Sequence, residues 1–417
     1  MATMTRAEVE DKAPLLRSLE KGAQPPHAPL KHAEIVVVGA GVAGAAVACL
    51  LGRAGYDVVL ADLHAEVRPD FRVEKLGADQ IEMLERLGLL EGVTELATPF
   101  WSVVNVHRGH LIDRTDRLHY GISYSDLVVA LRRQMPDTVR FLISRIADIQ
   151  TGDTHQRVVL GDGRTIDARL IVLATGLGSA IRSKLGITRR VLHEHHSTTF
   201  GFTIEPSGSS RFTFPSLVAY GEDVADAIDY LSLFPLGDAM RANLFTFLDR
   251  ADPRVQAFRQ NPEHTLLGMM PGLRSFLGSF RVVDAVATGI MSLWTLEGHR
   301  QSGVVVVGDA FQTSCPAAGT GVSRLLTDVD RLCNVYVAAW LATPGMGADK
   351  IAAFYDDPDK RAADANAAAK AAHRRALTTD ASLRWTLRRG QHLLRRRMVG
   401  WLKQHGRAVA TAQVSGG

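Results

Sequence analysis

The sequence of 417 residues is long enough for two or three domains, and its 46% hydrophobic and 22% charged residues are typical of a globular protein. This composition excludes a disordered chain, a collagen-like fibre and a disulfide-stapled miniprotein. The formal net charge of +4 is unevenly distributed, because residues 361–417 contain 12 Lys/Arg against two Asp/Glu and the preceding residues carry a net charge of −6. A nucleic-acid-binding surface is therefore not predicted, since the excess of basic residues is confined to the tail.

The first residues and the cysteines indicate the cellular environment. Residues 1–30 are charged and then proline-rich (AQPPHAP), which predicts a flexible leader without the apolar segment of a secretory signal. Cys49, Cys315 and Cys333 are widely spaced and form no C-x-x-C pair. This pattern favours a reducing, cytoplasmic location over a disulfide framework or a zinc site.

The segment from residue 34 to residue 62 has the pattern of a strand–helix–strand unit of a parallel sheet. An apolar run (IVVV, 35–38) precedes a glycine turn, a helix to about residue 53 and a second strand at 58–61. Residues 35–52 carry no charge and have the minimum length of a membrane span. Because three glycines interrupt the run and weaken a helix, a buried strand, turn and helix are predicted instead.

The turn itself reads Gly39-Ala-Gly41-Val-Ala43-Gly44, a G-x-G-x-x-G motif that opens a helix. In such a motif the first glycine makes the sharp turn, the second lets a pyrophosphate approach the backbone and the third lets helix and strand pack closely. The following strand ends at Asp62, where a carboxylate can accept hydrogen bonds from a ribose hydroxyl. The segment predicts dinucleotide binding, with the phosphates at the helix N-terminus.

Farther along the chain the pattern changes twice, which predicts an α/β fold in five parts. A Rossmann-like dinucleotide-binding domain with a parallel sheet (31–192) follows the leader (1–30). An inserted substrate domain with an antiparallel sheet (193–298) precedes the second part of the dinucleotide-binding domain (299–350). A basic helical section (351–417) ends the chain, and its residues are rich first in alanine and then in arginine.

A second motif distinguishes FAD from NAD. Gly308-Asp309-Ala310 follows an apolar strand and precedes Pro316-Ala-Ala-Gly319-Thr320-Gly321. With the first motif, this pair resembles the class A flavoprotein monooxygenases, the p-hydroxybenzoate hydroxylase family. The resemblance implies that Asp309 binds the ribityl chain, that Pro316 and Gly319 line the isoalloxazine and that the helix start at Thr320 and Gly321 faces the pyrimidine edge. It also implies that Arg72 contacts FAD.

The same resemblance implies an activity. Reduced FAD would react with O₂ to form a C4a-hydroperoxide that hydroxylates or epoxidises an apolar, aromatic or polycyclic molecule, with no metal. Electrons would come from NADH or NADPH, directly or through a separate flavin reductase. Two alternatives stay open: a reductase or dehydrogenase of a lipophilic, prenyl-type substrate, and a non-redox cyclase or binding protein in which flavin is structural.

Two departures from the family bear on the electron donor. Where the family carries A-D-G-x-x-S-x-x-R, this chain has Thr175 in place of the acid and keeps Arg182. Where the family has R-x-x-L, this chain has Tyr124 in place of the arginine. The motifs therefore support FAD binding more strongly than direct binding of NAD(P)H.

Substrate contacts are predicted on the strands of the second domain, with Phe202 and Phe234 as apolar walls and Arg241 and Asn243 as polar anchors. The histidines at 193, 195 and 196 are predicted to be solvated or part of a linker and not to bind a metal, since adjacent strand residues point to opposite faces. The basic tail shows an apolar helical stripe, Leu383, Leu387, Leu394, Met398 and Trp401. Packing of this stripe on its own domain is preferred over contact with an anionic membrane or with an acidic partner such as a carrier protein.

Overall fold

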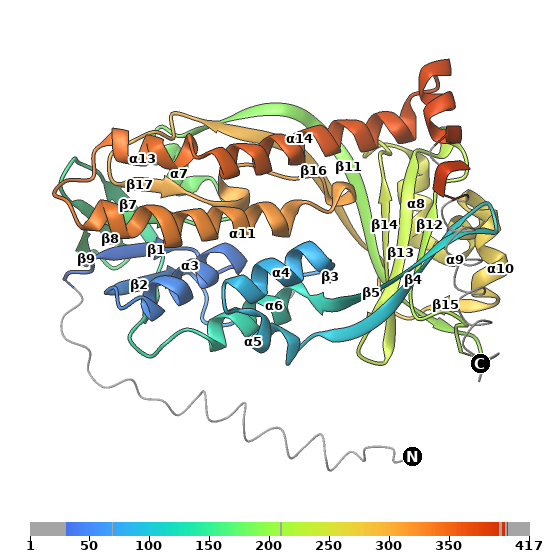
Figure 1. The fold of residues 1–417 in the computed structure, drawn as a ribbon, viewed down its shortest axis with the longest axis horizontal. Coiled ribbons are helices and arrows are strands. Elements are labelled where there is room, and N and C mark those ends of the chain that lie inside the picture. The colour runs from blue at the N-terminus through green and yellow to red at the C-terminus, as the bar shows by residue number, and fades with distance from the viewer. Residues whose placement is uncertain (1–30, 69, 209–210, 392–393, 397, 399–417) are drawn as a thin grey trace, which may run out of the picture.

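The computed structural model describes residues 31–68, 70–208, 211–391, 394–396 and 398, so the predicted leader lies outside the described residues. Figure 1 shows two sheets side by side, with the long helix α14 (Pro358–Thr379) running along both of them. The smaller, parallel sheet carries helices on its faces, and the larger sheet stands across the other end of the molecule. The predicted α/β architecture is confirmed.

The parallel sheet is built from apolar strands that are buried on both faces. Its order is β17-β10-β1-β2-β6, and every neighbouring pair is parallel. Strands with helices on both sides read as continuous Val/Ile/Leu runs, as this sequence does. The five strands are β1 (Ile35–Val38), β2 (Val58–Asp62), β6 (Arg140–Ile143), β10 (Leu170–Leu173) and β17 (Val304–Val306).

The first helix, α3 (Val42–Arg53), connects β1 to β2 and is almost entirely buried. The predicted strand–helix–strand unit is therefore confirmed. Across the described residues, no helix is long and apolar enough to cross a membrane. The shorter helices of this half are α4 (Ala78–Arg86), α5 (Leu90–Thr94), α6 (Tyr124–Arg133) and α7 (Ala180–Lys184), and a small antiparallel sheet contains β7 (Ile146–Gln150), β8 (Gln156–Leu160) and β9 (Thr165–Ala168).

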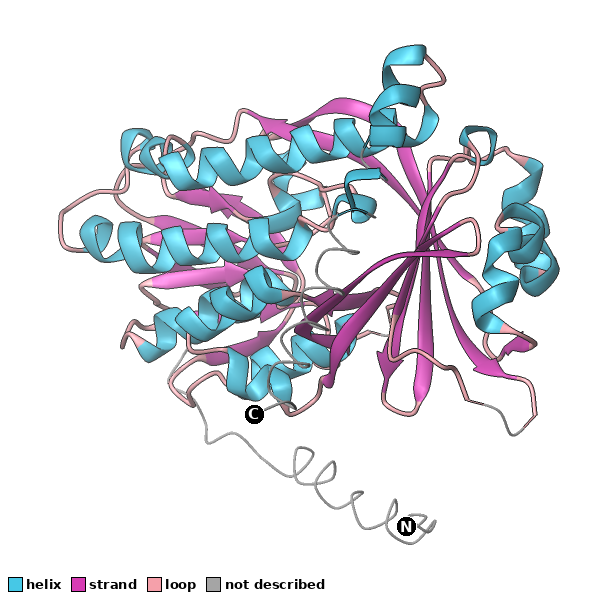
Figure 2. Cartoon of the chain, turned by 45° about the vertical axis from the view of Figure 1, so that its right-hand side comes forward, coloured by secondary structure: helices cyan, strands magenta, loops and turns pink. Residues whose placement is uncertain are grey.

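The larger sheet is the broad magenta sheet of Figure 2. It has nine strands, in the order β15-β11-β14-β13-β12-β4-β5-β3, with β16 also paired to β11. Its pairs are antiparallel except that β12 runs parallel to β4. The strands are β3 (Val73–Leu76), β4 (Thr98–His107), β5 (His110–Ser123), β11 (Thr188–Pro206), β12 (Leu217–Tyr220), β13 (Ile228–Leu236), β14 (Ala239–Thr246), β15 (Phe280–Val282) and β16 (Ala287–Glu297).

This sheet therefore combines two stretches of sequence, 73–123 and 188–297, and not residues 193–298 alone. Residues 73–123 join it because the hydrogen-bond ladder of β4 pairs with β12, more than 100 residues later in the chain. One face of the sheet packs against a helical layer formed by α8 (Pro253–Gln260), α9 (Pro262–Met269) and α10 (Arg274–Leu277). The other face is directed toward the parallel-sheet half.

Where the structure describes it, the C-terminal section is helical, as predicted, and a buried ionic cluster attaches it to the body. Helix α11 (Gly321–Arg331) continues through residues 332–341 and is followed by α13 (Ala348–Tyr355) and α14. Lys360 of α14 lies 2.7 Å from Asp328 of α11, and Arg324 lies 3.2 Å from Asp364. Removing these charges from water is costly, so their mutual pairing makes the α11–α14 contact specific.

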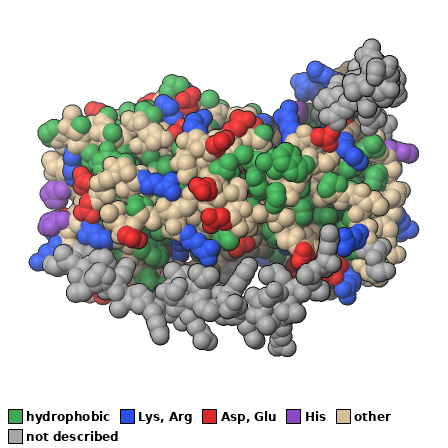
Figure 3. Space-filling model, turned by 60° about the horizontal axis from the view of Figure 1, so that its bottom comes forward, with side chains coloured by type: hydrophobic (Ala, Val, Ile, Leu, Met, Phe, Trp, Pro, Cys, Tyr) green, Lys and Arg blue, Asp and Glu red, His purple; other side chains and the backbone are tan. Residues whose placement is uncertain are grey.

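The prediction for the basic tail is wrong where the structure describes it. Leu383, Leu387, Leu394 and Met398 are 82%, 65%, 68% and 57% exposed, so this stripe does not pack on its own domain. Trp401 lies outside the described residues. On the coloured part of the face in Figure 3, basic and acidic side chains are interspersed.

Candidate flavin and substrate site

The first glycine motif forms a compact turn between β1 and α3. Gly39 has φ +100°, and a Cβ at this position would lie 2.6 Å from the carbonyl oxygen of Ala174. A Cβ at Gly44 would lie 1.7 Å from the carbonyl oxygen of Gly39, so the helix packs against the turn without room for a side chain. Gly41 is the N-cap of α3, and no side chain caps the helix. The uncapped N–H groups and the helix dipole suit a phosphate group.

Asp62 ends β2 beside this turn. Its Oδ2 accepts a hydrogen bond of 2.7 Å from the Ala40 N–H, and its Oδ1 accepts one of 2.9 Å from the His64 N–H. These main-chain donors orient the carboxylate. Asp62 also lines the same cavity as Gly39 and Gly41, the position required of a ribose-binding acid.

The second motif lies against the first in space. Gly308 has φ +64°, and a Cβ there would lie 3.1 Å from Cβ of Ala43 in α3. Its N–H donates to Asp328 Oδ2 at 2.8 Å, while Asp309 lies 3.7 Å from Arg324. The two motifs, about 265 residues apart in sequence, therefore meet at one cavity.

The loop after Asp309 leads into α11. Residues Pro316–Ala318 form a 3₁₀ turn, and Gly319 follows with φ +63°. The side chain of Thr320, the N-cap of α11, is buried, and its hydroxyl has no hydrogen-bond partner among the described residues. Gly321 then begins the helix, which no side chain caps. Unpaired donors at this position fit a bound polar group.

A cavity of about 980 Å³ joins the two motifs. Its lining includes nine of the predicted cofactor-binding residues: Gly39, Gly41, Ala43, Asp62, Arg72, Asp309, Pro316, Gly319 and Gly321. Gly44 and Gly308 lie behind this lining, where their lack of a Cβ permits close packing. The glycine cradle, the oriented carboxylate and the unpaired Thr320 hydroxyl fit FAD.

Arg72 and Tyr124 occupy the middle of the cavity. Arg72 pairs with Asp70 at 2.7 Å, lies 4.0 Å from Asp309, and stacks 3.8 Å above the centre of the Tyr124 ring. The Tyr124 hydroxyl would lie 3.1 Å from a Cβ on Gly41, so tyrosine stands at the phosphate end, where the family's arginine was expected. Burial raises the pKa of Tyr124, which keeps the phenol neutral and able to donate.

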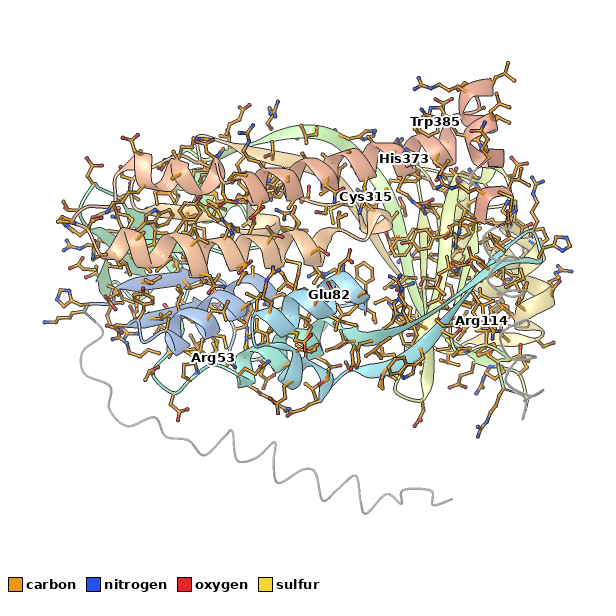
Figure 4. All side chains as sticks on the ribbon, in the orientation of Figure 1. Arg53, Glu82, Arg114, Cys315, His373 and Trp385 are labelled. Atoms are coloured by element: carbon orange, nitrogen blue, oxygen red, sulfur yellow. The ribbon has the colours of Figure 1, made fainter. Side chains whose placement is uncertain are left out.

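Arg182, retained from the other family segment, is buried and structural. Its guanidinium donates to the carbonyl oxygens of Ala310 and Gly178 and stacks over the ring of Trp294 at 4.9 Å. It therefore ties the loop containing Thr175 to the second glycine motif. Cys315, labelled in Figure 4, is buried and lines the cavity, and burial raises the pKa of its thiol.

The four predicted substrate contacts fall in different places. Asn243 lines the cavity, and its Nδ2 donates to the Val73 carbonyl oxygen at 2.9 Å. Arg241 is buried and donates to the Phe71 carbonyl oxygen at 2.6 Å, so it holds the segment that carries Arg72. The guanidinium is therefore used within the protein.

The two phenylalanines do not line the cavity. Phe202 points to the helical side of the sheet, where its ring lies 5.4 Å from that of Phe258. Alternation along β11 explains the error, because the neighbouring Gly201 faces the opposite side. Phe234 packs with Phe100 in a separate apolar cluster.

A profile of the family described as FAD binding domain matches residues 32–339. The FAD-dependent urate hydroxylase of Mycolicibacterium vanbaalenii is 23% identical over 324 residues, which cover 71% of this chain and 77% of that protein. The chain is a class A flavoprotein monooxygenase.

Further comparisons agree with this membership. The monooxygenase is 26% identical over 335 residues to the 3-demethoxyubiquinol 3-hydroxylase of Escherichia coli, covering 75% of this chain and 83% of that protein. Among solved structures, p-nitrophenol 4-monooxygenase from Pseudomonas putida DLL-E4 superposes with a TM-score of 0.70 at 18% identity, covering 89% of this chain and 94% of that chain. The last comparison shows that the fold is shared. The prenyl-type reductase alternative is not favoured.

Sequence reasoning missed several cavity residues of the monooxygenase. Phe71, Glu74 and Lys75 come from the β3 segment, while Ile290 and Met291 come from β16. No motif marks them, because they reach the cavity only through strand pairing. Burial lowers the pKa of Lys75 to about 8 and raises the pKa of Glu74.

The histidine cluster does not form a metal site in the described part of the chain, where no group of three His, Cys, Asp or Glu side chains lies close enough to hold an ion. His196 is buried between His193 and Phe247, with ring centres 4.9 Å and 5.5 Å away. Burial, reinforced by the charges of His193 and Arg375, lowers the pKa of His196 to about 4. The imidazole is therefore neutral in the folded protein at pH 7.

Proposed function

We propose that this monooxygenase hydroxylates or epoxidises an apolar, aromatic or polycyclic small molecule. The observation that carries the proposal is the single cavity in which both glycine motifs meet the sheet. Beyond the cofactor-binding residues, its wall includes the apolar side chains of Phe71, Phe245, Ile290 and Met291. The relatives named above act, by name, on urate, 3-demethoxyubiquinol and p-nitrophenol, all of which are ring compounds.

Each part of the cavity has a distinct task in this proposal. The α3 N-terminus and Asp62 would hold the phosphates and ribose of FAD, with Arg72 and Tyr124 beside them. Asp309 would hold the ribityl chain, and Pro316 and Gly319 would line the ring system. FAD supplies the activation of O₂ and the transfer of one oxygen atom once it is reduced.

The chain's own contribution is positioning and exclusion of water. The N-terminus of α11, which no side chain caps, would offer its N–H groups and positive dipole end to the electron-rich edge of the cofactor. The apolar residues opposite the Pro316–Ala318 turn exclude water and place the substrate ring. No acid–base pair is required of the protein for oxygen transfer in this scheme.

We propose NADH or NADPH as the electron source, either bound directly or acting through a separate flavin reductase. Thr175 and Tyr124, which replace the family's acid and arginine, support the indirect route. A cytoplasmic location belongs to the same proposal, and the three cysteines are buried and unpaired.

Stopped-flow spectra of the FAD-loaded protein with NADH, NADPH and externally reduced flavin test the proposal. We expect flavin reduction, followed by O₂ consumption in proportion to oxygenated product. Product formation without O₂ would indicate a reductase. Flavin that stays oxidised during turnover would indicate a non-redox cyclase or binding protein, and either result would overturn the proposal.

A further inference from the structure

A second cavity, of about 510 Å³, adjoins the flavin cavity and is lined by residues of the large sheet, of α14 and of the tail. It lies on the far side of the Pro316–Ala318 turn, since Ala317 and Ala318 contribute to its wall. Lys75 lines both cavities, and the Tyr230 hydroxyl donates to the Ala317 carbonyl oxygen at 3.2 Å. A molecule in the second cavity therefore lies next to the loop predicted to carry the flavin ring.

The lining of this second cavity is basic. Lys75 and His119 come from the sheet, Lys370, His373 and Arg374 come from α14, and Arg396 comes from the tail. Figure 4 marks this end of α14 by His373, with Trp385 beyond it. No aspartate or glutamate of the described residues lines the cavity.

The two arginines are neutralised within the protein. Arg374 lies 2.6 Å from Asp229, and Arg396 donates from two nitrogens to Asp113, at 2.8 Å each. Arg396 also donates to the Tyr220 hydroxyl at 2.5 Å. These pairs shape the cavity and attach the tail to the sheet, but they leave no net charge for a ligand.

The two lysines are different. Among the described residues, neither the Lys75 nor the Lys370 ammonium forms an ion pair or a hydrogen bond. Lys75 is partly buried near the flavin loop, and Lys370 is exposed at the rim. An unpaired ammonium in a partly buried cavity loses part of its hydration, and no protein group compensates for that loss. A bound anion would provide the missing electrostatic partner.

Resting on the proposed function, we propose that the substrate is an aromatic or polycyclic acid. Its carboxylate or phosphate is bound between Lys75 and Lys370 in the second cavity, and its apolar ring extends along Tyr230 toward the flavin loop. The cavity is large enough for a small-molecule group of this kind. Lys75 and Lys370 are therefore specificity-determining residues.

Three probes of the same shape test the charge requirement: 2-naphthoate, 2-naphthyl phosphate and uncharged 2-naphthamide. Each is titrated into full-length, FAD-loaded protein, and binding is followed by the visible spectrum of oxidised FAD and by calorimetry. We expect at least one of the anions to bind about tenfold or more tightly than the amide, the loss typical of a missing charged partner. Comparison of the two anions distinguishes a carboxylate from a phosphate site.

Variants then show which lysine is responsible for the preference for the anion. Lys75→Met should reduce the preference for the anion about tenfold, and Lys370→Met, at the exposed rim, by about threefold. Neither should change the affinity for the amide. Lys31→Met is the matched control, because Lys31 is exposed and lines neither cavity. FAD content, measured for every variant, shows whether the protein still folds around its cofactor.

Several results would overturn this inference. Equal affinities for anion and amide, or a preference that survives in both lysine variants, would exclude recognition by these residues. So would failure of all three probes to bind at about 10 mM, well above usual substrate requirements. Displacement of bound naphthoate by adenosine 2′,5′-bisphosphate at lower concentration would assign the cavity to a nucleotide donor instead. If wild-type protein bound no FAD or consumed no O₂, the proposed function itself would fail.

Discussion

Replacement of Lys360 by methionine should destabilise the protein by about 3–5 kcal/mol, the cost of removing one partner from a buried ion pair. The Lys360 ammonium lies 2.7 Å from Asp328 and 3.2 Å from Asp364, and the side chains of Lys360 and Asp328 are each only 1% exposed. Methionine would fill a similar volume but leave Asp328 with Arg324 alone, at 3.5 Å. Because Asp328 also accepts from the Gly308 N–H, FAD affinity should fall together with stability.

Urea unfolding of the FAD-loaded protein and titration of the apoprotein with FAD measure these two effects. The matched control is the double variant Asp328→Asn/Lys360→Met, which removes one charge of each sign and keeps an acceptor near Gly308. We expect the double variant to be more stable than the sum of the two single losses predicts, because partners in one network couple. A Lys360→Met protein with wild-type stability and wild-type FAD affinity would refute the importance of the cluster.

Three further predictions concern the cofactor turn and pH. Gly44→Ala should abolish bound FAD in the purified protein, because its Cβ would lie 1.7 Å from the Gly39 carbonyl oxygen; Gly268→Ala, with open space around it and no positive φ, is the control. Asp62→Asn should raise the Kd of the apoprotein for FAD about tenfold or more, and an unchanged Kd would contradict the ribose assignment. Because the pKa of His196 is lowered to about 4 from 6.5, its neutral form stabilises the fold above pH 6.5, and this contribution is lost as the pH falls toward 4. Between pH 7 and pH 5 the free energy of unfolding should decrease by about 2 kcal/mol, and His196→Leu should remove that part of the pH dependence.

The cofactor half of the molecule was largely predictable from sequence because its signals are local. A glycine at position 39 or 319 marks a positive φ, which other residues rarely adopt. Buried parallel strands read as apolar runs, and Asp62 must follow such a run at its carboxyl end. Position along the chain was therefore sufficient to identify both motifs.

The substrate half was predicted less well because its residues are selected by pairing between distant segments. Phe202 and Gly201 are neighbours, yet strand alternation places only one of them toward the flavin side. Arg241 resembles a substrate anchor in sequence but is engaged by the Phe71 carbonyl oxygen, 170 residues away. Nothing near Lys75 marks it as a binding residue.

The sequence by itself determined that a dinucleotide turn, a second flavin motif and a basic helical tail are present. Only the tertiary structure decided that β12 pairs with β4, that Lys75 and Lys370 face one cavity and that the apolar tail stripe stays exposed. The physical reason is the separation along the chain of the residues that interact. Backbone conformation and strand hydrophobicity are set by neighbouring residues, whereas the two ammonium groups share one cavity because strand pairing and helix packing bring together residues that lie far apart along the chain.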